Sequence, residues 1–65
     1  MYDTYVRLRD EKGVTDYKVS QETGVSTATL SEWKKGTYTP KIDKIQRIAS
    51  YFGVPIDTFL ETQEA

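Results

Sequence analysis

The 65-residue chain contains no cysteine and no histidine. Without cysteine, neither a disulfide nor a thiolate metal site can supplement a small hydrophobic core. Without histidine, the chain lacks the commonest general base and the commonest metal ligand. It also lacks a phosphate-binding glycine loop and a plausible cluster of metal ligands. We therefore expect no enzyme activity, no metal and no cofactor.

Long apolar runs and a strong charge of one sign are absent as well. No stretch approaches the length that spans a bilayer, and residues 1–12 are too polar for a signal peptide. The formal net charge is −1, which argues against a polycation that binds nucleic acid non-specifically. These features favour a single soluble domain over residues 1–65, located in the cytoplasm.

The charged side chains are distributed unevenly along the chain. Residues 1–33 have a net charge of −2, and residues 48–65 have a net charge of −3. Between them, residues 34–47 carry five basic side chains against one acidic, a net charge of +4. An acidic domain can still bind phosphates if its cations converge on one face. The basic segment is therefore a candidate anion-binding surface.

The sequence is organised around the segment from residue 15 to residue 36. It contains two helical patterns, and each is preceded by a hydroxyl residue suited to cap a helix, Thr15 and Ser26. Gly24 and Gly36 are placed to end these helices in the left-handed conformation. One contiguous apolar face is formed by Val19, Val25, Leu30 and Trp33. Two short helices that cross at a tight turn form a helix-turn-helix.

Three further helical patterns flank the helix-turn-helix segment. The sequence therefore predicts an all-α, compact five-helix bundle. The first pattern covers roughly residues 3–12, with Tyr5 and Leu8 facing the core. Val14 is expected to be buried in the link that follows. No segment has the alternating pattern of a strand.

The fourth and fifth helices follow the basic loop. Pro40 is tolerated in the first turn of a helix, and Thr39 is suited to cap that helix. The apolar residues at helical spacing are Ile42, Ile45, Ile48, Ala49 and Phe52. In the short fifth helix, Phe59 and Leu60 are adjacent and cannot both face the same core. One of them is available to cover a partner in a weak homodimer, together with Ile56 or the C-terminal tail.

The order of these features resembles the phage-repressor and Cro-like family of helix-turn-helix (XRE-type) transcriptional regulators. The matching stretches are Leu8-Arg9, Gly13-Val14-Thr15, Gly24-Val25-Ser26, Lys34-Lys35-Gly36, Pro40 and the closing run from Ile48 to Leu60. They extend over about residues 5–61, in order and without large gaps. The resemblance implies a compact five-helix domain whose third helix enters the DNA major groove.

With Leu30 and Trp33 pointing inward, the opposite side of the third helix carries the candidate base-reading residues: Thr27, Ala28, Ser31 and Glu32. A threonine hydroxyl bonds to several base edges, small methyl groups suit a thymine methyl, and a carboxylate accepts from a cytosine amino group. The candidate phosphate-contacting residues are Tyr17, Lys18, Lys35, Thr37, Tyr38 and Lys41.

Several of these side chains also have a purely structural interpretation. Lys34 and Lys35 would complement the dipole at the end of the third helix. Thr27 would belong to an ordinary polar first turn. Tyr38 is equally suited to donate to a phosphate and to cover the core. Trp33, by its spacing, is expected in the core and not as a platform for a DNA base.

Three positions depart from the family pattern. Many relatives pair the arginine of the first helix, here Arg9, with a glutamate where this chain has Lys34. Since both positions are basic here, Arg9 needs another partner. Relatives often carry a DNA-contacting glutamine where this chain has Asp16, which a phosphate would repel, so Asp16 is left outside the site. Lys41 replaces the usual small polar cap, which favours a helix start at Pro40.

The sequence therefore predicts a sequence-specific regulator that binds double-stranded DNA, either a small phage or bacterial repressor or the DNA-binding domain of one. The expected target is a palindromic operator, with no small-molecule substrate and no membrane. The alternative is a protein-interaction module of the same fold, an antitoxin-like or adaptor domain. The basic loop favours DNA, whereas the net negative charge and the acidic tail keep the alternative open.

Overall fold

Five helices follow one another in residues 1–60, the part of the chain that the computed structural model describes. They are α1 (Tyr2–Lys12), α2 (Asp16–Thr23), α3 (Thr27–Lys35), α4 (Ile42–Phe52) and α5 (Asp57–Leu60). No strand occurs within these residues, and the all-α, five-helix prediction is confirmed.

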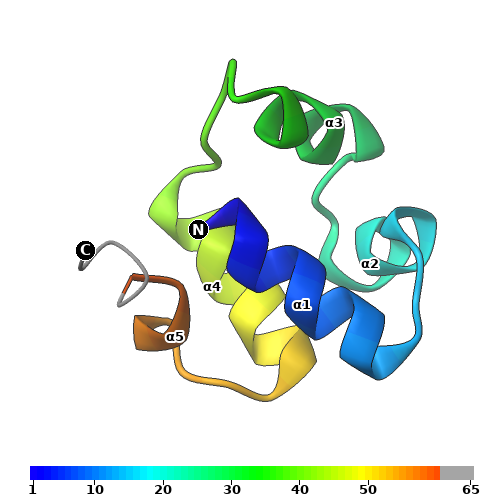
Figure 1. Cartoon of the computed structure of the whole chain (residues 1–65), viewed down its shortest axis with the longest axis vertical. Coiled ribbons are helices and arrows are strands. Elements are labelled where there is room, and N and C mark those ends of the chain that lie inside the picture. The colour runs from blue at the N-terminus through cyan, green and yellow to red at the C-terminus, as the bar shows by residue number, and fades with distance from the viewer. Residues whose placement is uncertain (61–65) are drawn as a thin grey trace.

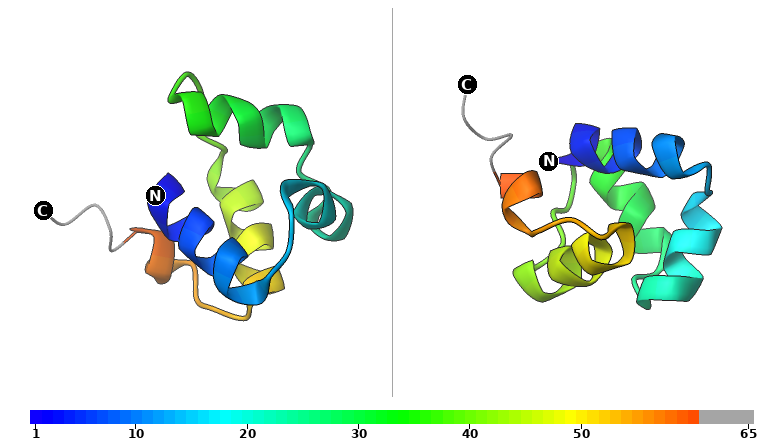
Figure 2. Two further views of the ribbon diagram at one scale, coloured as in Figure 1. Left: turned by 45° about the vertical axis from the view of Figure 1, so that its right-hand side comes forward. Right: turned by 90° about the horizontal axis from the view of Figure 1, so that it is seen from below.

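The helix α4 is central, because it packs against α1, α2 and α5. The helix α3 lies along one end of the molecule beside α2, whereas α5 lies near the start of α1 (Figures 1 and 2). One side of α3 is thus covered by the bundle and the other side is left uncovered.

The helix-turn-helix segment begins and turns at the residues that the sequence predicts. The Thr15 hydroxyl accepts a hydrogen bond from the backbone N–H of Lys18 at 3.2 Å. The Ser26 hydroxyl accepts from the backbone N–H of Thr29 at 3.1 Å. Gly24 ends α2 with a φ of +80°, which other residues adopt only with strain. These caps set the lengths of α2 and α3 and the direction in which α3 leaves the turn.

The core receives at least one large side chain from every helix. Its buried apolar residues are Tyr5, Val19, Val25, Leu30, Trp33, Ile45, Ile48, Ala49 and Phe59. The ring centroid of Trp33 lies 5.4 Å from those of both Tyr2 and Tyr5, and the indole therefore joins α3 to α1. The prediction that Trp33 lies in the core is confirmed.

The start of α4 differs from the prediction. The helix begins at Ile42, and Lys41 takes the N-cap position without a side-chain hydrogen bond. The predicted start at Pro40, after a Thr39 cap, is therefore wrong. Pro40 is buried, and its apolar ring packs inward from the extended chain that precedes the helix. Burial of an apolar ring is favourable, and here it accompanies a helix start two residues later than predicted.

Four apolar side chains are less buried than predicted, and one of them is the partly buried Phe52 at the end of α4. Leu8 and Val14 are only partly buried at the edge of the core, and Ile42 is 58 % exposed. Ile42 is the first residue of α4. The small Thr4 is buried on α1 in addition to Tyr5. Phe59 is buried and Leu60 is 38 % exposed, so the two adjacent residues face in different directions as expected.

Residues 1–60 contain neither a candidate metal site nor a candidate membrane-spanning helix. No group of acidic side chains there is arranged to hold a metal ion. None of the helices there combines the length and the apolar composition that a membrane crossing requires.

Candidate nucleic-acid interface

All ten side chains that the sequence assigns to DNA are exposed. They are Tyr17, Lys18, Thr27, Ala28, Ser31, Glu32, Lys35, Thr37, Tyr38 and Lys41. Four of them lie on the outer side of α3, two near the start of α2, and the others at the end of α3 and along the loop that follows it. The buried side of α3 carries Leu30 and Trp33, so its base-reading candidates face away from the bundle.

Glu32 on α3 is bonded to a residue just beyond the end of the helix. The Thr37 hydroxyl donates a hydrogen bond to the Glu32 carboxylate. The backbone N–H of Thr37 donates to the carbonyl oxygen of Glu32 at 3.1 Å. The structure thus brings together two residues to which the sequence gave different roles, one at the bases and one at the phosphates.

The two candidates on α2 each have a partner one helical turn further on. The Tyr17 hydroxyl accepts a hydrogen bond from the Gln21 amide at 3.1 Å. The Lys18 ammonium lies 3.2 Å from the Glu22 carboxylate. Sequence reasoning missed Gln21 and Glu22, although their spacing of four residues on a helix is a pattern that predicts such pairs. Tyr17, which is 65 % exposed, keeps its own hydroxyl hydrogen available as a donor.

Arg9 finds its partner in Asp16, the residue that the sequence excluded from the DNA site. The Arg9 guanidinium donates to an Asp16 carboxylate oxygen at 3.0 Å, and the Tyr5 hydroxyl donates to the same oxygen at 2.5 Å. Arg9 also lies 3.1 Å from the Asp10 carboxylate. Asp16 thereby joins the first turn of α2 to α1, which is a structural role.

The same contacts change the ionisation of two groups. Burial, and then the hydrogen bond to Asp16, raise the pKa of the Tyr5 phenol well above its usual range. The hydrogen bond to Asp16 raises the pKa of the Arg9 guanidinium further above its usual value. The contacts therefore favour the neutral form of Tyr5 and the charged form of Arg9 in the folded domain.

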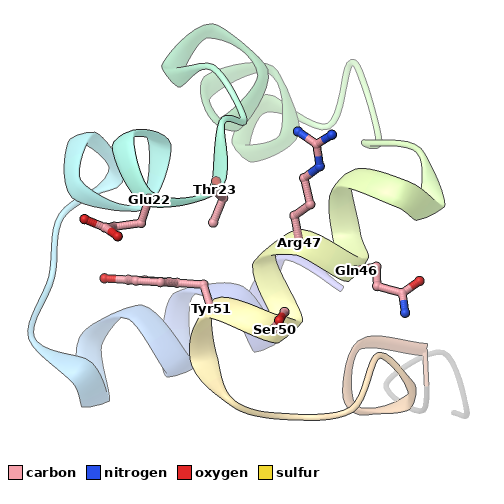
Figure 3. A pocket seen from close by; sticks show the side chains of 6 residues that line it. All are labelled: Glu22, Thr23, Gln46, Arg47, Ser50 and Tyr51. Carbon is pink, nitrogen blue, oxygen red and sulfur yellow. The ribbon is translucent and has the colours of Figure 1, made fainter.

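An open hollow lies between α2 and α4, on residues that the sequence did not single out as a group. Its lining consists of Glu22, Thr23, Gln46, Arg47, Ser50 and Tyr51 (Figure 3). The Arg47 side chain extends from α4 toward the turn between α2 and α3 (Figure 3). A Cβ added at Gly24 would lie 3.3 Å from its guanidinium. Arg47 is therefore directed toward the turn.

The basic segment 34–47 does not present all its cations in the same way. Lys34, Lys35, Lys41 and Arg47 are exposed, whereas Lys44 is half-buried. Arg47 is in addition directed toward the turn between α2 and α3. The exposed lysines lie at the end of α3 and immediately before α4. The three exposed lysines are therefore the cations of this segment nearest to the end of α3, whereas the exposed Arg47 lies at the turn between α2 and α3.

Two capped helices that cross at a left-handed glycine, inside a five-helix bundle, define a helix-turn-helix domain. The sequence pattern of the helix-turn-helix family matches residues 7–59, and the chain belongs to this family. The resemblance to the phage-repressor and Cro-like regulators is thereby confirmed.

Two curated relatives are similar to the chain. The first is the cryptic phage CTXphi transcriptional repressor RstR of Vibrio cholerae, with 31 % identity over 65 residues, 98 % of this chain and 59 % of the relative. The second is the HTH-type transcriptional activator BcrR of Enterococcus faecalis, with 29 % identity over 58 residues, 89 % of this chain and 28 % of the relative. The chain thus spans less than two thirds of either relative. No solved structure gives a significant match.

Proposed function

We propose that the chain binds double-stranded DNA sequence-specifically and regulates transcription, with α3 in the major groove. The exposed outer face of α3 carries this proposal, because it is polar and continuous while its inner face is buried. The relatives, a repressor and an activator, support a role in transcription. We favour a phage or bacterial repressor that acts in the bacterial cytoplasm, since the alignment with the phage repressor covers more of this chain.

The base-reading residues in this proposal are Thr27, Ala28, Ser31 and Glu32. Thr27 and Ala28 follow the Ser26 cap at the end of α3 that enters a groove first. Their small side chains suit hydroxyl bonds to base edges and contact with a thymine methyl. Glu32 lies one turn further on, where its carboxylate accepts a hydrogen bond from a base amino group and disfavours nearby phosphates.

The phosphate contacts flank this face on both sides. On one side, α2 offers Tyr17, Lys18 and the backbone amides of its first turn. On the other side, Lys35, Tyr38 and Lys41 extend from the end of α3 and the loop that follows. Contacts of this kind hold the domain on the DNA without reading its sequence. Thr37, the sixth residue predicted for this group, donates a hydrogen bond to Glu32.

We further propose that two copies bind a palindromic operator. A single recognition helix reads only a few base pairs, which gives little discrimination across a genome. The exposed Leu60 of α5 is the side chain that we assign to the second copy. Residues 61–65, the tail that the sequence offered as a further contact, lie outside the described residues. No observation on residues 1–60 favours the alternative of a protein-interaction module.

The proposal is tested by selecting duplexes from a random DNA library with the purified protein. Binding to the selected duplex and to a scrambled duplex is then measured at two salt concentrations. We expect a preference of roughly 10³-fold or more for the selected duplex, with both affinities falling as salt rises. Equal affinity for the two duplexes would refute sequence-specific binding, and no binding to either would refute DNA binding itself.

A further inference from the structure

The turn that ends α3 has the same backbone arrangement as the turns that end α1 and α4, but a different type of residue after its glycine. At the ends of α1, α3 and α4, a left-handed glycine is followed by a residue whose backbone N–H bonds back to the last helical turn. This is the Schellman arrangement, in which the residue after the glycine commonly makes an apolar contact with the helix. After α1 and α4 that residue is a valine, Val14 or Val54, and both pack against the core. After α3 it is the exposed Thr37.

Threonine and valine have nearly the same shape, so the difference lies in the hydroxyl group. The Thr37 hydroxyl donates to the carboxylate of Glu32 and is also within hydrogen-bond distance, 3.2 Å, of the Glu32 carbonyl oxygen. The backbone N–H of Thr37 donates to the same carbonyl oxygen at 3.1 Å. The turn fixes the backbone of Thr37, so its side chain stands beside Glu32. The polar Thr37 therefore stands at the position after the glycine, where the ends of α1 and α4 have an apolar valine.

The same bonds leave Thr37 without a donor for DNA. A threonine has one hydroxyl hydrogen and one backbone N–H, and both are directed to Glu32. A phosphate oxygen only accepts hydrogen bonds, and the neighbouring carboxylate would repel it. Thr37 is thus unsuited to the phosphate contact that the sequence predicts for it.

Glu32 gains a defined orientation from this contact. A free glutamate side chain on a helix surface has several rotamers, and ordering them on binding weakens a contact. With one carboxylate oxygen engaged by Thr37, the second remains available as an acceptor at the outer face of α3. Among base edges in the major groove, the cytosine amino group is the usual donor to a glutamate.

We propose that Thr37 is a positioning residue, which holds the Glu32 carboxylate in the orientation that accepts a hydrogen bond from the amino group of one cytosine. This inference rests on the proposed function. It adds that Glu32 recognises a cytosine and that Thr37 orients the Glu32 carboxylate for this contact. Thr37 acts through Glu32 and does not contact DNA.

The test compares Thr37→Val, Thr37→Ser, Glu32→Gln and the Thr37→Val/Glu32→Gln double variant. Thr37→Val introduces valine, the residue that follows the glycine at the ends of α1 and α4. Thr37→Ser is the matched control that keeps the hydroxyl. Each protein is titrated with the selected operator, with a set of operators changed at one base pair each, and with scrambled DNA. Thermal melts establish that every variant is folded.

We expect Thr37→Val to lose discrimination at one C·G base pair, by about threefold to tenfold, as the ordering of one flexible side chain would require. Glu32→Gln should lose discrimination at the same base pair, and the double variant should be no worse than Glu32→Gln alone. Thr37→Ser should behave as the unchanged protein. Affinity for scrambled DNA and its salt dependence should be the same in Thr37→Val.

Two results would overturn the inference while leaving the proposed function in place. If Thr37→Val weakens all sequences equally and lowers the salt dependence, Thr37 contacts a phosphate. If Thr37→Val retains full discrimination at every base pair, Thr37 only ends the helix. By contrast, an unchanged protein that does not discriminate between operator and scrambled DNA refutes the proposed function itself.

Discussion

Trp33 is the side chain through which α3 is attached to α1. Its indole lies against Tyr2 and Tyr5 and is 5 % exposed. Truncating a buried tryptophan to alanine costs about 3–5 kcal/mol, because the apolar contacts are lost and a cavity remains. Since the smallest domains have little more than about 5 kcal/mol of stability, we expect Trp33→Ala to be largely unfolded at room temperature. Thermal melts followed by circular dichroism measure this.

Tyr17→Ala is the matched control, since Tyr17 is an aromatic residue that is 65 % exposed. It should melt within a few degrees of the unchanged protein. A melting temperature of Trp33→Ala that is equally close would contradict burial of the indole, and would reopen its assignment as a platform for a DNA base.

Tyr5 gives the fold a dependence on alkaline pH. Its pKa is raised by burial and by the hydrogen bond to Asp16, so the folded chain keeps the phenol neutral when the unfolded chain ionises, near pH 10. Above that pH the unfolded state binds fewer protons than the folded state. The contribution of Tyr5 to stability is therefore complete below about pH 10 and falls by about 1.4 kcal/mol per pH unit above it.

The measurement is the free energy of unfolding in denaturant at a series of pH values from about 8 to 11. Tyr5→Phe has no phenol at this position and should lose stability less steeply above pH 10. Its stability below pH 10 should be lower, because Asp16 loses a donor. Identical slopes for the two proteins would show that Tyr5 ionises alike in the folded and unfolded states.

At the scale of the elements, the outer face of α3 and the lysines at its end and in the following loop should respond to mutation in opposite ways. Thr27→Ala and Glu32→Gln remove groups that we assign to base edges, so each should cost about 1–3 kcal/mol on the operator with scrambled DNA nearly unaffected. For Glu32→Gln, non-specific affinity should hold or rise, because a negative charge is removed. Lys35→Ala and Lys41→Ala should weaken all sequences similarly and lower the salt slope by about one unit.

Binding to the operator and to scrambled DNA across a salt series measures both effects in one experiment. The two lysine variants serve as controls for the Thr27 and Glu32 variants, since all four side chains are exposed. Full operator preference in both Thr27→Ala and Glu32→Gln would mean that α3 is not the reading element.

The ends of the helices were predictable from the sequence where nearby capping residues determine them. Thr15 and Ser26 precede helical patterns, Gly24 and Gly36 follow them, and the structure has caps and turns at these residues. Caps of this kind depend on residues within four positions of one another, and sequence reasoning has access to that range. The start of α4 was not predictable in this way, because burial of Pro40 is a tertiary effect.

The contacts within the candidate site divide in a similar way. The pairs on α2 follow from helical spacing, and the Thr37–Glu32 pair follows from the turn after Gly36, so both were accessible to local rules. The partner of Arg9 was not, because it depends on the angle at which α1 meets α2. Exposure of all ten candidate residues agrees with their assignment to an interface, whereas their roles on DNA remain predictions.

At the scale of the whole molecule, the operator complex should contain two chains. Leu60 is 38 % exposed on α5, and we expect Leu60→Ser to weaken operator binding by about tenfold through loss of apolar contact between the copies. Its melting temperature should stay close to that of the unchanged protein. Sedimentation with a saturating amount of protein measures the stoichiometry. One chain per duplex, with a footprint over one half-site, would rule the dimer out.

The position of Trp33 also gives the molecule an optical property. It is the one tryptophan of the chain, and two tyrosine rings lie within 5.4 Å of it in the folded state. Light absorbed by these tyrosines is therefore transferred efficiently to the indole, and this transfer is lost when unfolding separates the rings. Since Trp33 faces the core and not the outer side of α3, its emission reports whether the domain is folded and is shielded from direct quenching by DNA bases. The fluorescence of the unlabelled protein can thus distinguish a variant that has lost DNA binding from one that has lost its fold.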